Sequence, residues 1–398
     1  MGQTTVRQAA ALQIPASQAV LSRDYPGTAC LRGRYELYME GDFGRTYKSV
    51  LSWKRCVVLE PEKEMTFWPE FCRSSDVQLR FCLYLQEIDA AGNETTEWLE
   101  ADNLMEPVVI PVGRARRRLA ITLQLKGSGE ITLGPIHLRE RIPNGAAFLA
   151  GSLRRTDAYR EELFSYFNPM DRKAPLTVYF SGRRPQEGFD GVDLMWEKRM
   201  PFLLLADPRC GGGCSCLGSA EYEEVVEQRV RGAMEQLELP LEQVIMIGSS
   251  LGATAALYYG ALIHPGAMVL GRPVVNLGTV AERERIRRPG GFPASLDILQ
   301  KLTGHVNEAS AGELDRRIWS RIDGGDFAGT EMVIGYMEED DYDPKAYMEL
   351  LHHLRGQQCL IYGKGFSGRH NDNQEQVMDW LRLQYDRLLE ERYGRGET

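Results

Sequence analysis

A short stretch rich in glycine and serine, residues 248–252 (Gly-Ser-Ser-Leu-Gly), constrains the fold of this chain most. It follows the apolar run 244–247 and precedes the small-residue segment 253–260, which has a helical pattern. A strand, then G-x-S-x-G, then a helix is the context of a nucleophile elbow. This turn is so tight that the residues two before and two after the serine must lack a bulky side chain. The sequence therefore predicts that Ser250 presents its hydroxyl at a strand-to-helix turn.

From about residue 146 onward, apolar strand patterns alternate with helical patterns. The predicted strands lie at 176–180, 202–206, 244–247, 267–270, 332–335 and 358–362. The predicted helices lie at 159–167, 222–237 and 344–354, together with the helix after the elbow and a closing helix. Such alternation is typical of a doubly wound, mostly parallel sheet. With the elbow inside it, segment 146–398 is predicted to be an α/β-hydrolase-like catalytic domain.

Residues 1–145 have a different pattern, which indicates a β-rich domain. Apolar and polar residues alternate over 77–85, as in a half-buried strand. The segments 119–125 and 131–138 alternate as well, and the glycine-containing turn 126–129 between them is a hairpin signature. We therefore expect an N-terminal β-sandwich.

This predicted sandwich has two possible roles. It is either a structural or interface domain, or a carbohydrate-binding domain with aromatic side chains that stack on sugars. The candidate stacking residues are Trp53, Trp68, Trp98 and Tyr38.

Charge and cysteine content exclude several classes of protein. The formal net charge is −9, which argues against nonspecific binding to nucleic acid. The eight cysteines resemble the free thiols of a cytosolic chain rather than a disulfide framework. The spacing of Cys210, Cys214 and Cys216 matches no common zinc pattern, so we expect a glycine-rich loop and no metal. No signal peptide or membrane-spanning run is visible, so the expected location is the cytoplasm.

The general base for Ser250 is predicted to be His370. A serine hydroxyl needs a base, the base needs an orienting carboxylate, and on this fold their chain order is serine, acid, histidine. His370 lies in a glycine-punctuated loop between the last predicted strand and the closing helix. The acid must come from the run 338–343, where Asp340 occupies the common position after the strand and Glu339 is the alternative.

Two backbone amides are predicted to bind the oxyanion. The first is that of Leu251, because it stands at a helix N-terminus directly after the nucleophile. The second should come from the loop after the first strand of this domain, at Gly182 or Arg183. The Gly- and Pro-rich segments 271–278 and 288–297 are expected to shape a lid or pocket wall.

Several short motifs in order resemble one known family. They are Phe180-Ser-Gly182, Glu187-Gly-Phe189, Asp207-Pro-Arg209, the elbow with 256–260, Gly271-Arg-Pro273, Asn276-Leu-Gly278, 292–297, Asp341-Tyr-Asp343 and Gly368-Arg-His-Asn-Asp-Asn373. Together, over roughly residues 130–398, they resemble the second accessory secretory protein of the bacterial accessory Sec system. The match is specific because many motifs agree in order, although each alone is weak.

The resemblance implies an α/β-hydrolase-like domain with a Ser-carboxylate-His triad, in which Ser250 is the nucleophile and His370 the base. It implies O-acetylation of N-acetylglucosamine on exported serine-rich glycoproteins. It also implies partnership with other accessory Sec proteins, through which the chain would associate with the membrane.

Three functions therefore remain open from the sequence. The leading one is an O-acyltransferase without a bound cofactor, which uses an acyl donor such as an acetyl thioester as co-substrate. A carbohydrate esterase would use the same residues with water as acceptor. A non-catalytic export or glycan-binding scaffold is the third.

Overall fold

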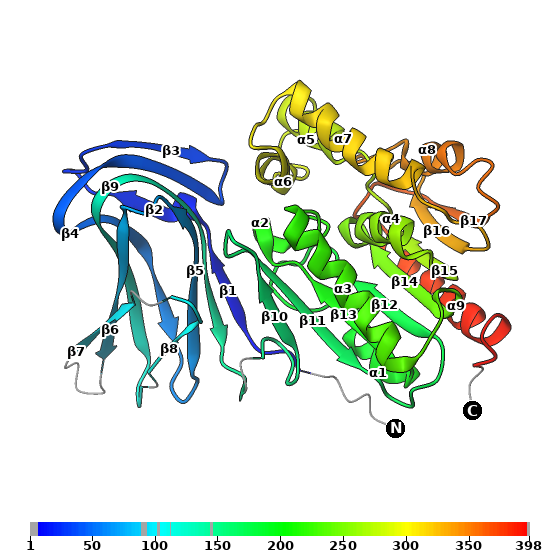
Figure 1. Ribbon diagram of the computed structural model, residues 1–398, viewed down its shortest axis with the longest axis horizontal. Helices are drawn as coiled ribbons and strands as arrows, with labels where there is room; N and C mark the ends of the chain where they lie inside the picture. The colour runs from blue at the N-terminus through cyan, green and yellow to red at the C-terminus, as the bar shows by residue number, and fades with distance from the viewer. Residues whose placement is uncertain (1–6, 89–93, 102–103, 112, 144–145, 396–398) are drawn as a thin grey trace. The chain divides into compact units, whose positions relative to one another are not determined.

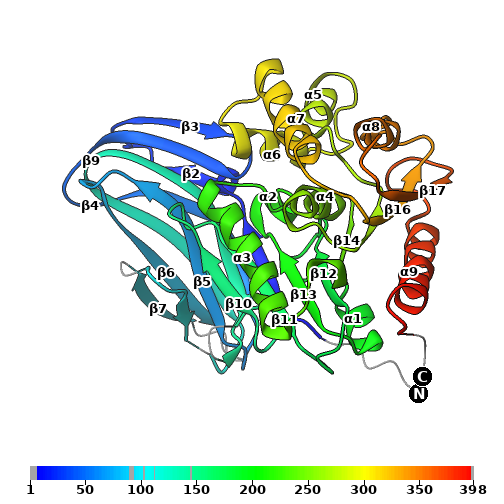
Figure 2. The ribbon, with the colours of Figure 1, turned by 45° about the vertical axis from the view of Figure 1, so that its right-hand side comes forward.

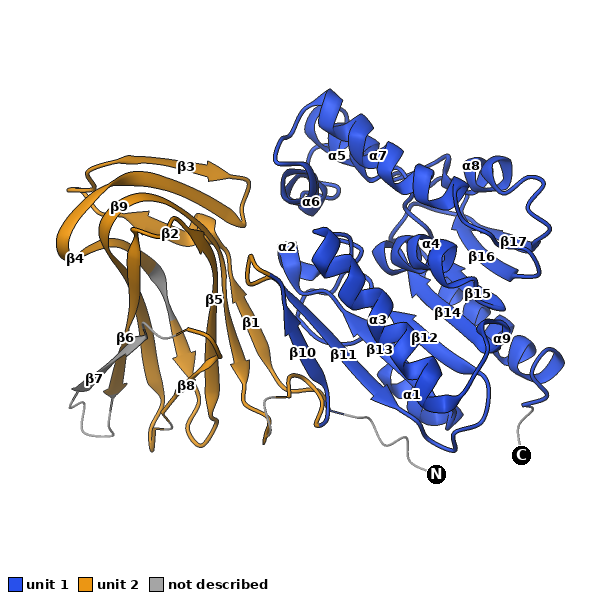
Figure 3. Cartoon of the chain, in the orientation of Figure 1, with its two compact units in different colours: residues 1–7, 151–157, 162–398 blue, residues 8–150, 158–161 orange. Residues whose placement is uncertain are grey.

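The computed structural model of the chain describes residues 7–88, 94–101, 104–111, 113–143 and 146–395. These residues form two compact units (Figure 3). The β unit comprises residues 8–150 and 158–161, and the α/β unit comprises 151–157 and the chain from 162 onward, together with residue 7. Within the described ranges, no helix is both long and apolar enough to span a bilayer.

The β unit contains nine strands in one antiparallel sheet. They are β1 (Ala11–Ile14), β2 (Ala19–Leu21), β3 (Thr28–Arg32), β4 (Glu36–Leu59), β5 (Met65–Arg73), β6 (Gln78–Ile88), β7 (Glu94–Ala101), β8 (Val108–Ile110) and β9 (Arg117–Glu140). Figure 1 shows β4 and β9 as long curved strands. They pair along most of their length, and alternate residues of both contribute to one apolar core.

The predicted hairpin at 119–138 is wrong, because these residues form the single strand β9. Its first half pairs with β6 and its second half with β5, so the chain does not reverse. Gly127 and Gly129 have φ of +93° and +139°. A left-handed residue serves a bulge or bend in a strand as well as a turn, and here the glycines bend β9.

The predicted sugar-stacking role is wrong for two of its candidates. Trp53 and Trp68 are 4% and 2% exposed, so they are core residues. Tyr38 is partly exposed, but the Arg32 guanidinium lies 4.5 Å from its ring centre. Trp98 is on β7, whose side chains lie outside the described ones.

The α/β unit contains an eight-stranded sheet in the order β10-β11-β13-β12-β14-β15-β16-β17. The strands are β10 (Leu153–Thr156), β11 (Glu162–Asn168), β12 (Leu176–Phe180), β13 (Phe202–Ala206), β14 (Val244–Ser249), β15 (Ala267–Gly271), β16 (Glu331–Met337) and β17 (Leu360–Phe366). The pairs from β13 to β17 are parallel, whereas β10 and β11 are antiparallel additions at one edge.

Helices cover both faces of this sheet (Figures 1 and 2). The helices of the unit are α1 (Val192–Lys198), α2 (Arg209–Gly212), α3 (Ala220–Leu237), α4 (Leu251–Ile263), α5 (Leu277–Ile286), α6 (Ala294–Thr303), α7 (Glu308–Asp323), α8 (Ala346–His353) and α9 (Gln374–Glu391). Of these, α5, α6 and α7 pack mainly on one another. Phe180 of β12 stacks on Tyr259 of α4, whereas Thr177 of the same strand hydrogen-bonds Tyr385 of α9. Residues three apart in a strand face opposite sides, so α4 and α9 cover opposite faces, as the doubly wound prediction requires.

Two predicted elements of this unit are corrected. The helix expected at 159–167 is the strand β11, which pairs with β10 and β13, because tertiary pairing overrides a short apolar run of ambiguous period. The strand expected at 358–362 begins at Leu360 and continues to Phe366. Gly363 belongs to it because the Tyr347 ring packs there, so close that a Cβ would lie 1.9 Å from the Tyr347 hydroxyl oxygen.

Candidate active site

The elbow has the geometry that the sequence predicts. Ser250 lies between β14 and α4 with φ 54° and ψ −120°, a backbone conformation that non-glycine residues rarely adopt. A Cβ on Gly248 would lie 2.1 Å from the Gly252 carbonyl oxygen, and a Cβ on Gly252 would lie 2.3 Å from that of Phe180. Both positions therefore require glycine. The Ser250 amide donates to the Gly271 carbonyl at 2.7 Å, which ties the turn to the end of β15.

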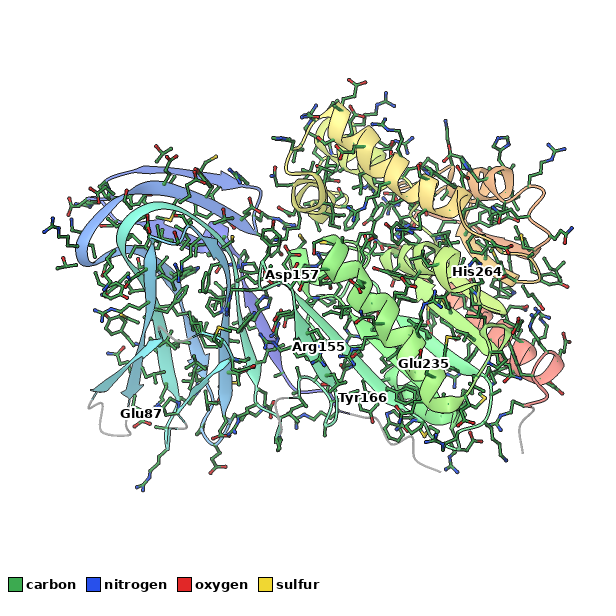
Figure 4. The ribbon with its side chains drawn as sticks, viewed as in Figure 1. Glu87, Arg155, Asp157, Tyr166, Glu235 and His264 are labelled. Atoms are coloured by element: carbon green, nitrogen blue, oxygen red, sulfur yellow. The ribbon has the colours of Figure 1, made fainter. Side chains whose placement is uncertain are left out.

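His370 lies next to Ser250 although the two residues are 120 positions apart in the sequence. Its Nε2 lies 2.9 Å from Ser250 Oγ, within hydrogen-bonding distance for proton transfer. The His370 side chain is buried, in the segment between β17 and α9. His264, in contrast, ends α4 (Figure 4). The thirteen residues of α4 place it about 20 Å from the elbow, so it does not compete as the base.

Asp340 orients this histidine. Its Oδ2 lies 2.8 Å from His370 Nδ1, and its Oδ1 accepts the amides of Tyr342 and Asp343 at 2.8 and 3.0 Å. Burial by itself would raise the pKa of Asp340. The hydrogen bond and charge of His370 and the two amides outweigh that effect and hold the pKa below its ordinary value. The carboxylate is therefore ionised at neutral pH.

Glu339, the alternative acid, does not reach His370. Its exposed carboxylate accepts the Gly368 amide in the loop before the histidine. Asp341 also serves that loop, because its Oδ1 accepts the His370 amide at 3.0 Å. Of the acidic run, only Asp340 bonds to the imidazole among the described contacts, and its neighbours hold the backbone around it.

Tyr342, a neutral member of the acidic run, packs flat on the imidazole. The ring centroids of Tyr342 and His370 are 4.2 Å apart and the planes differ by 9°. The Tyr342 hydroxyl donates to the Gly291 carbonyl and accepts from Asn371 Nδ2. Arg288 lies 4.3 Å from the Tyr342 ring centre and donates to Asp341. The Gly- and Pro-rich segment 288–297 thus contacts the histidine and acid loops, as expected of a pocket wall.

Of the predicted oxyanion donors, Leu251 and Arg183 fit better than Gly182. Leu251 is the first residue of α4, where an amide has no acceptor within the helix. The Gly182 amide is already used, since it donates to Asp190 Oδ2 at 2.8 Å. The Arg183 amide has no acceptor among the hydrogen bonds of the described chain. A Cβ on Gly252 would lie 3.1 Å from the Gly182 nitrogen, so this loop packs directly against the elbow.

The cysteine loop is built around an ion pair. Asp207 Oδ2 accepts the amides of Cys214 and Cys216 and one nitrogen of Arg209, and Asp207 and Arg209 are both buried. Burial raises the pKa of the Cys214 and Cys216 thiols well above the ordinary value. Among the described residues, no three His, Cys, Asp or Glu side chains are grouped as metal ligands would be. We therefore describe this loop as a structural element packed against Arg183 and Arg184 through Gly212.

Comparison with known proteins gives consistent results. Residues 7–395 match the family described as the accessory Sec system GspB-transporter. An accessory Sec system protein of Staphylococcus aureus (strain NCTC 8325 / PS 47) is 35% identical over 378 residues, which cover 95% of this chain and 72% of that protein. A second, from Streptococcus gordonii, is 35% identical over 376 residues, covering 94% and 74%.

A solved structure also resembles the whole fold. It is a chain of the Glycosylation Associate Protein (Gap123) complex from Streptococcus agalactiae, with a TM-score of 0.93 and 34% sequence identity. The similarity covers 99% of this chain and 76% of that one.

Proposed function

This chain belongs to the accessory Sec system GspB-transporter family, and we propose that it is a serine-dependent O-acetyltransferase acting on glycans of exported glycoproteins. The observation that carries the proposal is the unbroken line of hydrogen bonds from Asp340 through His370 to Ser250. A serine becomes a competent nucleophile when an oriented base can take its proton. A scaffold that performs no chemistry has no need of this arrangement.

The first half-reaction would load an acetyl group onto Ser250. Its Oγ attacks the carbonyl carbon of an acetyl thioester, the proposed donor, while His370 Nε2 takes the hydroxyl proton. The amides of Leu251 and Arg183 would donate to the tetrahedral oxyanion. The carbon–sulfur bond then breaks, the leaving sulfur takes the proton from His370, and an acetyl ester remains on Ser250.

The second half-reaction would pass the acetyl group to a sugar. A hydroxyl of N-acetylglucosamine gives its proton to His370 Nε2 and attacks the acetyl carbon of the ester. The bond between that carbon and Ser250 Oγ breaks, and Oγ recovers a proton from His370. The product is an O-acetylated sugar, and the enzyme returns to its starting state. If water takes the place of the sugar, the same residues perform ester hydrolysis.

The proposed acceptor, location and partners rest on the family. The acceptor would be N-acetylglucosamine on serine-rich adhesins, modified in the cytoplasm before export. The solved relative belongs to a complex of glycosylation-associated proteins, which supports other accessory Sec proteins as partners of this chain. We further propose that the β unit is an accessory domain of this assembly.

One assay separates these functions. Wild type and Ser250→Ala are each given an activated acetyl ester with and without N-acetylglucosamine, and both free acetate and acetylated sugar are measured. We expect acetylated sugar only with wild type and sugar together. Ser250-dependent acetate without acetylated sugar would identify an esterase. If neither product depends on Ser250, the scaffold function replaces the proposal.

A further inference from the structure

Arg272, directly after β15, is buried at the centre of the candidate site although no proposed chemical step uses it. It is 7% exposed, and its φ of 47° is left-handed. Its amide donates to the Gly335 carbonyl of β16 at 2.6 Å. The backbone at Arg272 is thus fixed between the strand beside the elbow and the strand that leads to the acid.

The guanidinium of Arg272 bridges the residue before the proposed nucleophile and the backbone of the proposed base. Its Nη1 donates to the His370 carbonyl oxygen at 2.8 Å, and its Nη2 donates to Ser249 Oγ at 3.1 Å. Ser249 directly precedes the nucleophile, and His370 is the base. One planar side chain therefore connects the elbow to the histidine loop, two segments that are far apart in the sequence.

The Ser249 side chain borders a cavity. A cavity of about 150 Å³ lies against Ser249, between the sheet and helices α1 and α9. Apart from Ser249, its lining includes Leu194 of α1 and Met378, Leu381 and Tyr385 of α9. Within the described chain, Arg272 is the one hydrogen-bond partner of the Ser249 hydroxyl. The hydrogen bond from Arg272 therefore fixes the position of the Ser249 side chain, which close packing would do in a core without a cavity.

The buried positive charge of Arg272 is expected to destabilise the fold. Burial lowers the pKa of its guanidinium, and the nearby Asp340, Tyr342 and Tyr179 compensate only in part. No carboxylate of the described residues forms an ion pair with it, and its buried Nε has no hydrogen-bond partner there. A buried charge that lacks an ion pair destabilises a fold. Stability alone therefore does not explain an arginine at this position.

We propose that Arg272 is a positioning residue that sets the separation of Ser250 and His370, through Ser249 on one side and the His370 carbonyl on the other. The inference rests on the proposed acyl transfer for its effect on rate, but the positioning itself is a property of the resting protein. The hydrogen bonds of Arg272 go to the His370 carbonyl and to Ser249, not to Ser250 Oγ or the imidazole, so we expect it to act on kcat with little effect on KM.

The test compares Arg272→Met, which keeps the length and removes the donors, with Arg272→Lys, which restores a cationic donor. Arg321→Met serves as control, because Arg321 lies on α7 and its guanidinium stays 3.9 Å from its acidic partner Glu223. In the acetyl ester assay we expect kcat to fall about 100-fold in Arg272→Met, the cost of a misplacement of about 1 Å. KM stays within about threefold, Arg272→Lys recovers part of the rate, and the control matches wild type.

A second measurement needs no turnover. In the substrate-free proteins, the NMR resonance of the His370 Nδ1 proton shared with Asp340 reports how the imidazole is held. We expect it in wild type and Arg321→Met, broadened or shifted in Arg272→Met, and partly restored in Arg272→Lys. Wild-type kcat and an unchanged resonance in Arg272→Met would overturn the proposal. A rise in KM as large as the fall in kcat in Arg272→Met, with no recovery in Arg272→Lys, would also overturn it.

The two measurements also separate this inference from the proposed function. If wild type shows no Ser250-dependent turnover, the acyltransferase proposal fails, and the resonance alone decides whether Arg272 positions His370. Thermal unfolding of each variant is recorded in parallel. Should Arg272→Met fail to fold, Ser249→Ala takes its place, because it removes the acceptor of Arg272 Nη2 and keeps the arginine. A broadened or shifted resonance in that variant supports positioning, and an unchanged one overturns it.

Discussion

The phenol ring of Tyr342 lies parallel to the imidazole of His370, with 4.2 Å between ring centroids. The Phe292 ring also stacks on the Tyr342 ring, with 5.0 Å between centroids and an interplanar angle of 2°. Arg183 of the oxyanion loop lies 5.9 Å from the Phe292 ring centre. The histidine is thus one end of a stack whose other end lies at the Arg183 side chain, in the loop proposed to bind the oxyanion.

Tyr342 should therefore affect turnover through its ring and stability through its hydroxyl. Tyr342→Leu removes the flat surface against His370, and we expect kcat to fall about 10-fold. Tyr342→Phe keeps the ring but loses two hydrogen bonds, so we expect near-normal kcat and a loss of about 1–3 kcal/mol in the free energy of unfolding. Steady-state kinetics and urea unfolding check both. Equal kcat in the two variants would contradict the stacking role.

Asp340 and Glu339 make a matched pair for the acid. In Asp340→Asn the side chain no longer stabilises a protonated imidazole, and we expect kcat to fall about 10⁴-fold, as in other serine triads. Glu339→Gln changes an exposed side chain beside Gly368, so its kcat should stay within about twofold of wild type. Hydrolysis of an activated acetyl ester measures both. The reverse order of effects would assign the acid to Glu339.

The elbow glycines give a second matched pair. Gly252→Ala places a Cβ 2.3 Å from the Phe180 carbonyl oxygen, and such overpacking costs about 1–3 kcal/mol of stability and displaces Ser250. Gly232 lies inside α3, where an added Cβ would meet no atom within 4 Å, so Gly232→Ala should stabilise by about 0.5–1 kcal/mol. Chemical denaturation and kcat test the pair. Wild-type kcat in Gly252→Ala would mean that the elbow can relax.

Asp315 should make stability depend on pH. Burial raises its pKa to about 6, and the hydrogen bonds from Gly278 and Thr279 only partly offset this effect. A carboxyl whose pKa is higher in the folded state stabilises the fold when protonated. That stability is full below the ordinary pKa of 3.8 and is lost as pH rises to about 6 and above.

Asp315→Asn removes this titration. Relative to wild type, the variant should gain stability steadily as pH rises from about 4 to about 6, with no further change above about 7. Urea unfolding of both proteins across this range supplies the measurement. A constant difference between them would show that Asp315 does not titrate in that window.

The parts of the site that follow from local sequence could be predicted, and the parts made by distant packing could not. The elbow is a local motif, and the position of His370 after the last strand follows from the order of elements. Arg272 and Tyr342 lie in two of the short motifs that carry the family resemblance, but their roles could not be predicted, because their partners are far away in sequence.

The wrong predictions about the fold have the same origin, because they also depend on partners that are distant in sequence. A left-handed glycine permits either a reversal or a bend, and only the partners of β9 decide between them. The tryptophans of the β unit show that aromatic residues chosen by type alone give no information on burial. The β11 segment is apolar on both faces of a buried sheet, so it lacks the alternation that identifies a strand.

The separation of Ser250 from His370 by 120 residues has a consequence for biosynthesis. At a translation rate of about 5–20 residues per second, the serine leaves the ribosome roughly ten seconds before its base. β17 and α9 must also emerge and dock before the imidazole reaches the elbow. Under the proposed mechanism, a nascent chain therefore carries an unactivated serine until α9 has emerged and docked.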